Sequence, residues 1–205
     1  MLKKTNEKKG LSLMVILLIP VAIAINIVGG QMTSVLKLPL ALDTIGVILV
    51  GALSGPIPAA ITGVLTNLMN GIFDPTWIPY AFCSFFIGIT AGLLGKYNMM
   101  SNIWKMAISG LIIACVALVT ATPITVFFFG GVNGGGSTMI AAGLMATGKK
   151  IFEAVLSVSI VTETVGKTIS VMVAFAIMKA IPERSLVKFP YGVKYIKKKA
   201  HKSAS

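Results

Sequence analysis

Six long runs of apolar residues divide this chain, and few charges interrupt them. They cover about residues 11–30, 40–54, 56–73, 77–95, 104–129 and 152–181. A helix needs about 20 apolar residues to cross a bilayer. Only 12% of the residues are charged, against about 25% in soluble domains. The sequence therefore predicts an all-α integral membrane protein, a six-transmembrane-helix bundle that forms one domain over residues 11–182.

Positive charge gathers at the two ends of the chain. The net charge is +12, from 18 Lys and Arg against 6 Asp and Glu, and basic tails occupy residues 1–10 and 183–205. Segments rich in Lys and Arg stay in the cytoplasm, and an even number of spans leaves 14 of the 18 basic residues on that side. We therefore predict cytoplasmic N and C termini. The charge serves membrane topology in this interpretation, and we expect no nucleic acid partner.

The linker between the second and third runs, Ser54-Gly55-Pro56, carries no charge. A broken helix pair that does not fully cross the membrane is therefore an alternative to two complete spans. The first run is about 20 residues long, which exceeds the roughly 7 to 15 residues of a secretion-signal core. We expect it to remain as a transmembrane helix.

The sequence offers few groups for catalysis or metal binding. Cys83 and Cys115 lie within apolar runs, and the single histidine, His201, is in the C-terminal tail. The stretch GLMATGKK matches the first part of a phosphate loop. However, Lys150 stands where Ser or Thr would hold magnesium, and no strand precedes it, so we treat the match as chance. We expect no metal, no cofactor and no enzymatic activity, with a membrane enzyme as an alternative.

Polar side chains are costly in lipid, so their depth in the apolar runs is informative. With the predicted topology, every run carries such groups toward the outer half of the bilayer, as a pocket open to the outside would require. The candidate substrate-binding residues are Asn26, Gln31, Asp43, Asn67, Asn70, Trp77, Tyr80, Asn133, Glu163 and Lys167. Structural roles are the alternative: amides join helices, aromatic residues line the membrane interface, and Glu163 and Lys167 can neutralise each other.

Asn67 and Asn70 are three residues apart, which places both amides on one helix face. We expect this face to look toward further members of the pocket: Asn26, Gln31, Trp77 and Glu163. Amides suit a nucleobase edge and carboxylates suit sugar hydroxyls, whereas a strongly anionic substrate fits less well. The glycine-rich loop 130–148, which contains Asn133, is expected to be a lid or an ordinary flexible loop.

Small residues at four-residue spacing form a second pattern. They let helix backbones approach closely, either within the bundle or against another membrane subunit. The candidate partner-docking residues are Ala22, Gly51, Gly55, Ala59 and Gly63. No repeat relates the two halves of the chain, which argues against an inverted-repeat carrier. The sequence is also compatible with a stand-alone secondary carrier or with a structural assembly subunit.

Several stretches of the chain resemble a known family. Residues 24–73, which read AINIVGGQMTSVLKLPLALDTIGVILVGALSGPIPAAITGVLTNLMNGIF, and the later segments FFFGGVNGGGST and TETVGKTIS resemble the substrate-binding S components of energy-coupling factor (ECF) transporters. The resemblance covers most of residues 11–190. It implies a six-helix, multi-pass protein of the bacterial cell membrane that captures a micronutrient outside. Its implied partners are a transmembrane coupling subunit and two cytoplasmic ATPases.

The resemblance also bears on docking and on the substrate. The docking motif on the first helix of the family is Ala-x-x-x-Ala, and the nearest pairs here, Ala22 with Asn26 and Pro20 with Ala24, depart from it. The features that look most like nucleoside-binding members are the glycine-rich loop together with Gln31, Leu38-Pro39, Asp43 and Asn67. They imply a nucleoside substrate, with vitamins such as cobalamin or pyridoxine as the alternative.

Overall fold

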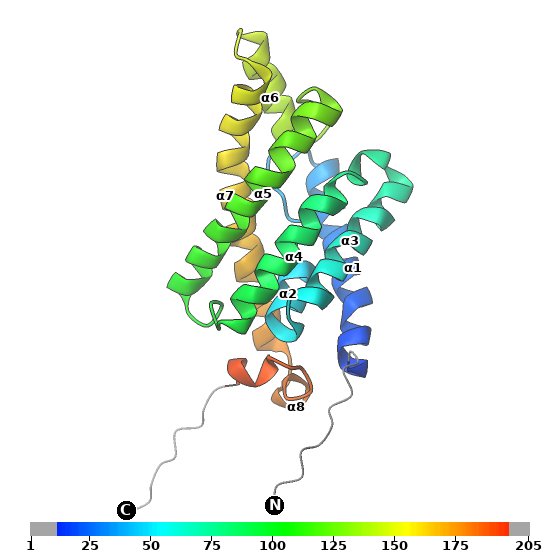
Figure 1. Cartoon of the computed structure of the whole chain (residues 1–205), viewed down its shortest axis with the longest axis vertical. Coiled ribbons are helices and arrows are strands. Elements are labelled where there is room, and N and C mark those ends of the chain that lie inside the picture. Colours follow the sequence, from blue (N-terminus) through cyan, green and yellow to red (C-terminus); the bar gives the residue numbers. More distant parts are fainter. Residues whose placement is uncertain (1–11, 197–205) are drawn as a thin grey trace, which may run out of the picture.

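The computed structural model describes residues 12–196, which fold into helices with no strand among them (Figure 1). This confirms the predicted all-α class. The tail 1–10, residues 197–205 and therefore His201 lie outside the described residues. The α-helices are α1 (Leu13–Val35), α2 (Ile45–Ser54), α3 (Pro56–Phe73), α4 (Tyr80–Lys96), α5 (Ile103–Phe129), α6 (Gly136–Ala146), α7 (Ile151–Ala180) and α8 (Glu183–Leu186), with the 3-10 turns η1 (Pro75–Trp77) and η2 (Gly192–Tyr195).

Three of these helices, α1, α5 and α7, are long and apolar enough to cross a membrane. The predicted helix over residues 40–54 is wrong in its first part, because α2 begins only at Ile45 and has 10 residues. Its length of about 15 Å is half of a hydrocarbon core of about 30 Å. Residues 40–44, which read Leu-Ala-Leu-Asp-Thr, form instead an extended linker whose backbone packs against α7, where a Cβ on Gly166 would lie 2.9 Å from the Ala41 nitrogen.

The short helix α2 forms the centre of the bundle. All ten of its residues are buried, and α1, α3, α4 and α7 all contact it. Two glycines permit this close packing. Gly46 has no room for a Cβ against the Ala22 carbonyl of α1, and a Cβ on Gly51 would lie 2.8 Å from the Ala91 backbone of α4. An apolar run that is buried on every side needs no amphipathic pattern, which explains why its sequence reads like a membrane span.

The predicted docking residues lie inside this packing. Glycines of α4 meet small residues of α3: a Cβ on Gly88 would lie 2.5 Å from the Ala60 backbone, and Gly92 has no room for one against Pro56. The five candidates are all buried within the chain: Ala22, Gly51, Gly55, Ala59 and Gly63. In this structure the five residues hold the chain's own helices together, which is the internal-packing alternative for this pattern.

The glycine-rich segment contains a helix that is not evident from its composition. Residues 136–146 form α6, which packs on α7 through Ala141, Val155 and Val158. The glycines are concentrated before it, where Gly130, Gly131 and Gly134 have positive φ and turn the chain from α5 into α6. The expectation of a loop over 130–148 is therefore corrected to a short loop followed by a helix.

The two ends of the described chain lie at the same end of the molecule. The start of α1 and the α8 segment lie opposite α6 in Figure 1. After α8, the chain turns back against the bundle: the Tyr191 N–H donates to the Leu53 carbonyl at 3.0 Å, and Lys194 Nζ donates to the Lys96 carbonyl at 2.6 Å. These bonds satisfy carbonyls at the ends of α2 and α4.

Candidate functional site

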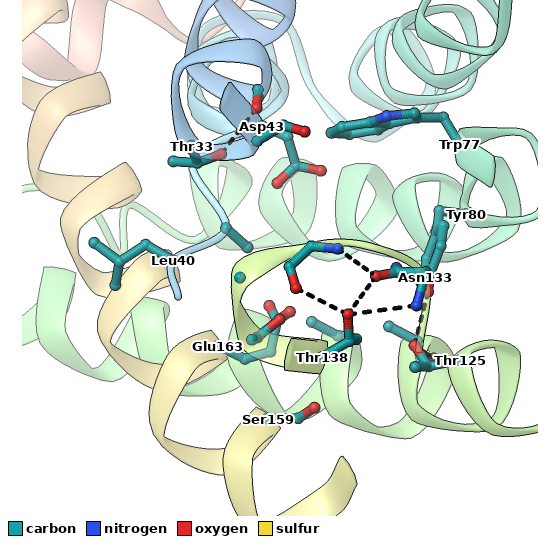
Figure 2. Close-up of a pocket in the computed structure, with 18 of the residues that line it drawn as sticks. Thr33, Leu40, Asp43, Trp77, Tyr80, Thr125, Asn133, Thr138, Ser159 and Glu163 are labelled. Atoms are coloured by element: carbon teal, nitrogen blue, oxygen red, sulfur yellow. Dashed lines mark hydrogen bonds between the residues drawn. The ribbon is translucent and has the colours of Figure 1, made fainter. Parts of the chain in front are cut away.

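A cavity of about 270 Å³ opens at the α6 end of the molecule. Its wall is formed by the second half of α1, the linker 36–44, η1, α4 and α5, the segment 133–138 and the first half of α7. Figure 2 shows side chains from these segments converging on one space. The cavity is therefore assembled from parts of the chain that are far apart in sequence.

Six of the ten predicted binding residues line this cavity. They are Asp43, Trp77, Tyr80, Asn133, Glu163 and Lys167. They come from the linker before α2, η1, α4, the glycine-rich loop and α7, so the structure brings together five segments that the sequence shows only as separate polar positions. These six polar side chains therefore converge on one cavity.

Lys167 lies between two carboxylates. Its Nζ is 3.4 Å from Asp43 Oδ1 and 3.4 Å from Glu163 Oε2, and only 2% of the residue is exposed. The pair with Glu163 follows from their spacing of four residues on α7. The pair with Asp43 joins α7 to the linker before α2, a contact that the sequence does not indicate. A buried ammonium needs such partners, because an unpaired charge is costly away from water.

Asn133 holds the glycine-rich loop in place. Its Nδ2 donates to the Tyr80 hydroxyl at 2.8 Å, and its Oδ1 accepts from the Gly135 N–H at 3.0 Å and from the Thr138 hydroxyl at 2.8 Å (Figure 2). Tyr80 in turn lies 2.7 Å from Thr125 Oγ1. The Asn133 amide thus has its hydrogen bonds inside the wall, which makes it a positioning residue for the loop.

Two aromatic rings contribute flat apolar surface to the cavity. Trp77 packs beside α1, where a Cβ on Gly30 would lie only 3.0 Å from Trp77 Cη2. The ring of Tyr80 is stacked on Phe129, with centroids 5.9 Å apart. In Figure 2, Trp77 and Tyr80 lie on the same side of the cavity, and Glu163 and Leu40 lie on the opposite side. A flat ligand ring has aromatic surface available in this space.

The remaining four predicted residues do not line the cavity. Asn26 bonds to Gly46 and Thr66, Gln31 donates to Asn70 Oδ1 at 3.3 Å, and Asn67 donates to Ser84 Oγ at 2.6 Å. These amides join α1, α2, α3 and α4, as polar groups between membrane helices commonly do. Asn70 faces Gln31 of α1 as expected, whereas Asn67 bonds to Ser84 of α4, which itself lines the cavity.

Several hydroxyl groups in the wall were not predicted as site residues. They belong to Thr33, Ser34, Ser84, Thr122, Thr125, Thr138 and Ser159. Thr122 is 3% exposed, and its hydroxyl has no hydrogen-bond partner among the described residues. The only sequence signal is the group of threonines near the end of the run 104–129. Single serines such as Ser84 and Ser159 are too common in membrane helices to stand out.

The linker 36–44 and the glycine-rich loop meet at the cavity rim. Lys37 Nζ donates to the Gly134 carbonyl at 2.9 Å, and Gly136 has no room for a Cβ against the Lys37 carbonyl. The exposed ammonium of Lys37 therefore serves a contact between the two connections that border the opening. Among residues 12–196, no group of three or more His, Cys, Asp or Glu side chains could hold a metal ion.

Comparison of the chain with protein-family models, curated proteins and solved structures finds no match. The chemistry of the site is therefore taken from the residues of the cavity. The cavity offers aromatic surface together with hydroxyl groups and carboxylates, and concave pockets of this composition commonly bind small molecules.

Proposed function

We propose that this protein is the substrate-capturing membrane subunit of an ECF-type uptake system, and that its cavity takes a nucleoside or a related ring-bearing micronutrient. The observation that carries the proposal is the cavity itself. It places Trp77 and Tyr80 beside carboxylates and hydroxyl groups in one cavity at one end of the helical bundle. Stacking surface with hydrogen-bonding groups around it suits a heterocycle with polar substituents.

The size of the cavity limits the substrate. A volume of about 270 Å³ is just below the range of about 300–1,000 Å³ that is common for ligand sites. A nucleoside or a pyridine vitamin is of this scale, whereas the corrin ring and nucleotide loop of cobalamin are several times larger. The cavity therefore favours a nucleoside or pyridoxine-type ligand over cobalamin.

The membrane arrangement in this proposal has six helices that enter or cross the bilayer, with both termini in the cytoplasm of a bacterial cell. The common location of the two described chain ends supports it (Figure 1), as does the excess of Lys and Arg in the tails. The cavity then opens to the outside. A transmembrane coupling subunit and two cytoplasmic ATPases complete the system, and they would contact exposed helix faces and not the buried glycines.

Binding and transport by the purified chain test this function. The full chain in detergent should gain thermal stability with a nucleoside or water-soluble vitamin, because a ligand at 100 times its Kd adds about 2.7 kcal/mol. Trp77→Ala should weaken binding of that compound by about 10-fold through lost stacking, whereas Trp104→Ala is the matched control, since Trp104 is exposed and outside the cavity. Vesicles containing this chain alone should bind the compound without accumulating it. Accumulation would identify a stand-alone carrier.

A further inference from the structure

The wall of the cavity contains more carboxylates than ammonium groups. The wall holds the carboxylates of Asp43, Asp74 and Glu163 and the ammonium groups of Lys37 and Lys167. Lys37 is exposed and bonds to a carbonyl, and the half-buried Asp74 accepts bonds from its neighbour Thr76. The remaining three groups, Asp43, Glu163 and Lys167, form an inner group that has one excess negative charge when both carboxyl groups are ionised.

The inner group leaves little opportunity for an anionic ligand. Lys167 is 2% exposed, and each of its two carboxylate partners is 3.4 Å away. An anion would have to displace one of these partners and leave a carboxylate without its ion pair, which is costly in a desolvated site. By contrast, the side chains of Asp43 and Glu163 are 20% and 17% exposed and keep acceptor capacity toward the cavity.

Some neutral polar groups of the wall have hydrogen-bond partners within the protein, and one does not. The Tyr80 hydroxyl and the Asn133 amide are satisfied by each other and by their neighbours. The Thr122 hydroxyl, in contrast, is buried in the wall without a partner among residues 12–196. A buried polar group that lacks a hydrogen bond is costly. A ligand group that reached the Thr122 hydroxyl would remove this cost.

We infer that the captured ligand is a cation whose positive charge is on or next to its ring. The inference rests on the proposed function and narrows its substrate class. A positive charge beside Asp43 and Glu163 would balance the inner group at two negative and two positive charges. Trp77 and Tyr80 add to the preference, because aromatic faces attract cations. The Thr122 hydroxyl can accept from or donate to a polar substituent of the same ligand.

Matched compounds that differ in charge test this inference directly. The full chain, purified in detergent at pH 7, is titrated by calorimetry with pyridoxamine against pyridoxine and with 1-methyladenosine against adenosine. The nicotinamide series adds a cation, a neutral molecule and an anion: 1-methylnicotinamide, nicotinamide and nicotinate. The cation of each set should bind about 10- to 100-fold more tightly than its neutral partner, because its positive charge is attracted by the two carboxylates and by the aromatic faces, and nicotinate should bind most weakly.

Glu163→Gln keeps the size of the side chain and removes its charge. It should reduce the affinity for the cations about 10-fold or more and change the affinity for the neutral compounds by less than about threefold. Glu153→Gln is the matched control, because Glu153 is on the same helix, exposed and outside the cavity. If Glu163→Gln does not fold, Asp43→Asn removes the second carboxylate. The affinities of the cationic, neutral and anionic compounds for the unmodified chain can be compared without either variant.

Each outcome has a defined meaning. Preference for the cations that falls in Glu163→Gln supports the inference. Equal or tighter binding of the neutral or anionic compounds overturns it and leaves the proposed capture function intact. If no compound of any charge binds, including a panel of nucleosides and water-soluble vitamins, both the inference and the proposed function are overturned.

Discussion

The side-chain oxygen of Asn26 accepts a hydrogen bond of 2.6 Å from the backbone N–H of Gly46. Gly46 is in the first turn of α2, where backbone N–H groups have no partner within the helix. Asn26 therefore caps α2 from the middle of α1, and its Nδ2 also donates to Thr66 of α3 at 3.0 Å. One fully buried amide joins three helices without facing the cavity.

Asn26→Ala should destabilise the protein and have little effect on ligand binding. The substitution leaves the Gly46 N–H and the Thr66 hydroxyl without this partner, at a cost of about 1–3 kcal/mol per buried group. The thermal unfolding temperature in detergent should fall clearly. Thr66→Val should cost less, because Asn26 can still cap α2. A normal unfolding temperature combined with lost binding would instead show that Asn26 contacts the ligand.

Asn133→Ala should loosen the glycine-rich loop. The substitution removes the side-chain bonds to Tyr80, Gly135 and Thr138, each with a net contribution of about 1 kcal/mol. Hydrogen exchange measured by mass spectrometry should become faster in residues 131–138, and ligand affinity should decrease by about 10-fold. Asn102→Ala is the control, because the Asn102 side chain makes no capping hydrogen bond. Unchanged exchange in the loop would mean that its backbone conformation, and not Asn133, holds it.

Gly92→Ala and Gly143→Ala should change stability in opposite directions. A Cβ on Gly92 would collide with the Pro56 backbone, whereas nothing lies within 4 Å of a Cβ on Gly143. Overpacking should cost Gly92→Ala about 1–3 kcal/mol or more. Gly143→Ala should gain about 0.5–1 kcal/mol, since Ala is the better residue in a helix. Unfolding temperatures of the two variants test the close contact between α3 and α4, and equal shifts would contradict it.

Tyr195 should make stability sensitive to alkaline pH. Its hydroxyl is buried without a hydrogen-bond partner among the described residues, and burial raises the pKa of Tyr195 from 10.0 to about 12. The unfolded chain therefore loses this proton more easily than the folded chain. The resulting stability is present in full below pH 10 and is lost as the pH rises toward 12.

The comparison with Tyr195→Phe isolates this contribution. The unmodified chain should lose unfolding temperature more steeply between pH 10 and pH 12, because Phe has no proton to release. The difference between the two pH profiles removes the contribution of the lysines, which both chains share. Parallel profiles would mean that the Tyr195 hydroxyl is solvated in solution.

The sequence predicted helices better than it predicted their lengths. Apolar runs located α1, α3, α4, α5 and α7, because each helix with an exposed apolar face has to be apolar over most of its length. The same criterion extended α2 over residues 40–44. It cannot distinguish a segment that faces lipid from one that the protein itself surrounds, since both are apolar.

For the candidate site, side-chain chemistry could be predicted, and the partners of each side chain could not. The spacing of Glu163 and Lys167 shows that they can pair, because both are on one helix. The contact of Lys167 with Asp43 spans 124 positions in the chain, and no local pattern encodes it. Amides such as Asn26 and Asn67 are equally able to bind a ligand or a neighbouring helix.

Composition and hydropathy by themselves determined that residues 12–196 fold into helices, three of them long and apolar enough to cross a membrane, since each apolar helix satisfies its own backbone hydrogen bonds. Tertiary structure alone decided which polar residues surround the cavity and which ones join helices. The physical reason is that burial and hydrogen bonding depend on how helices are rotated against one another. Contacts between backbones at residues such as Gly46, Gly51 and Gly92 set that rotation. They turn Asp43 and Glu163 toward the cavity and Asn26 away from it.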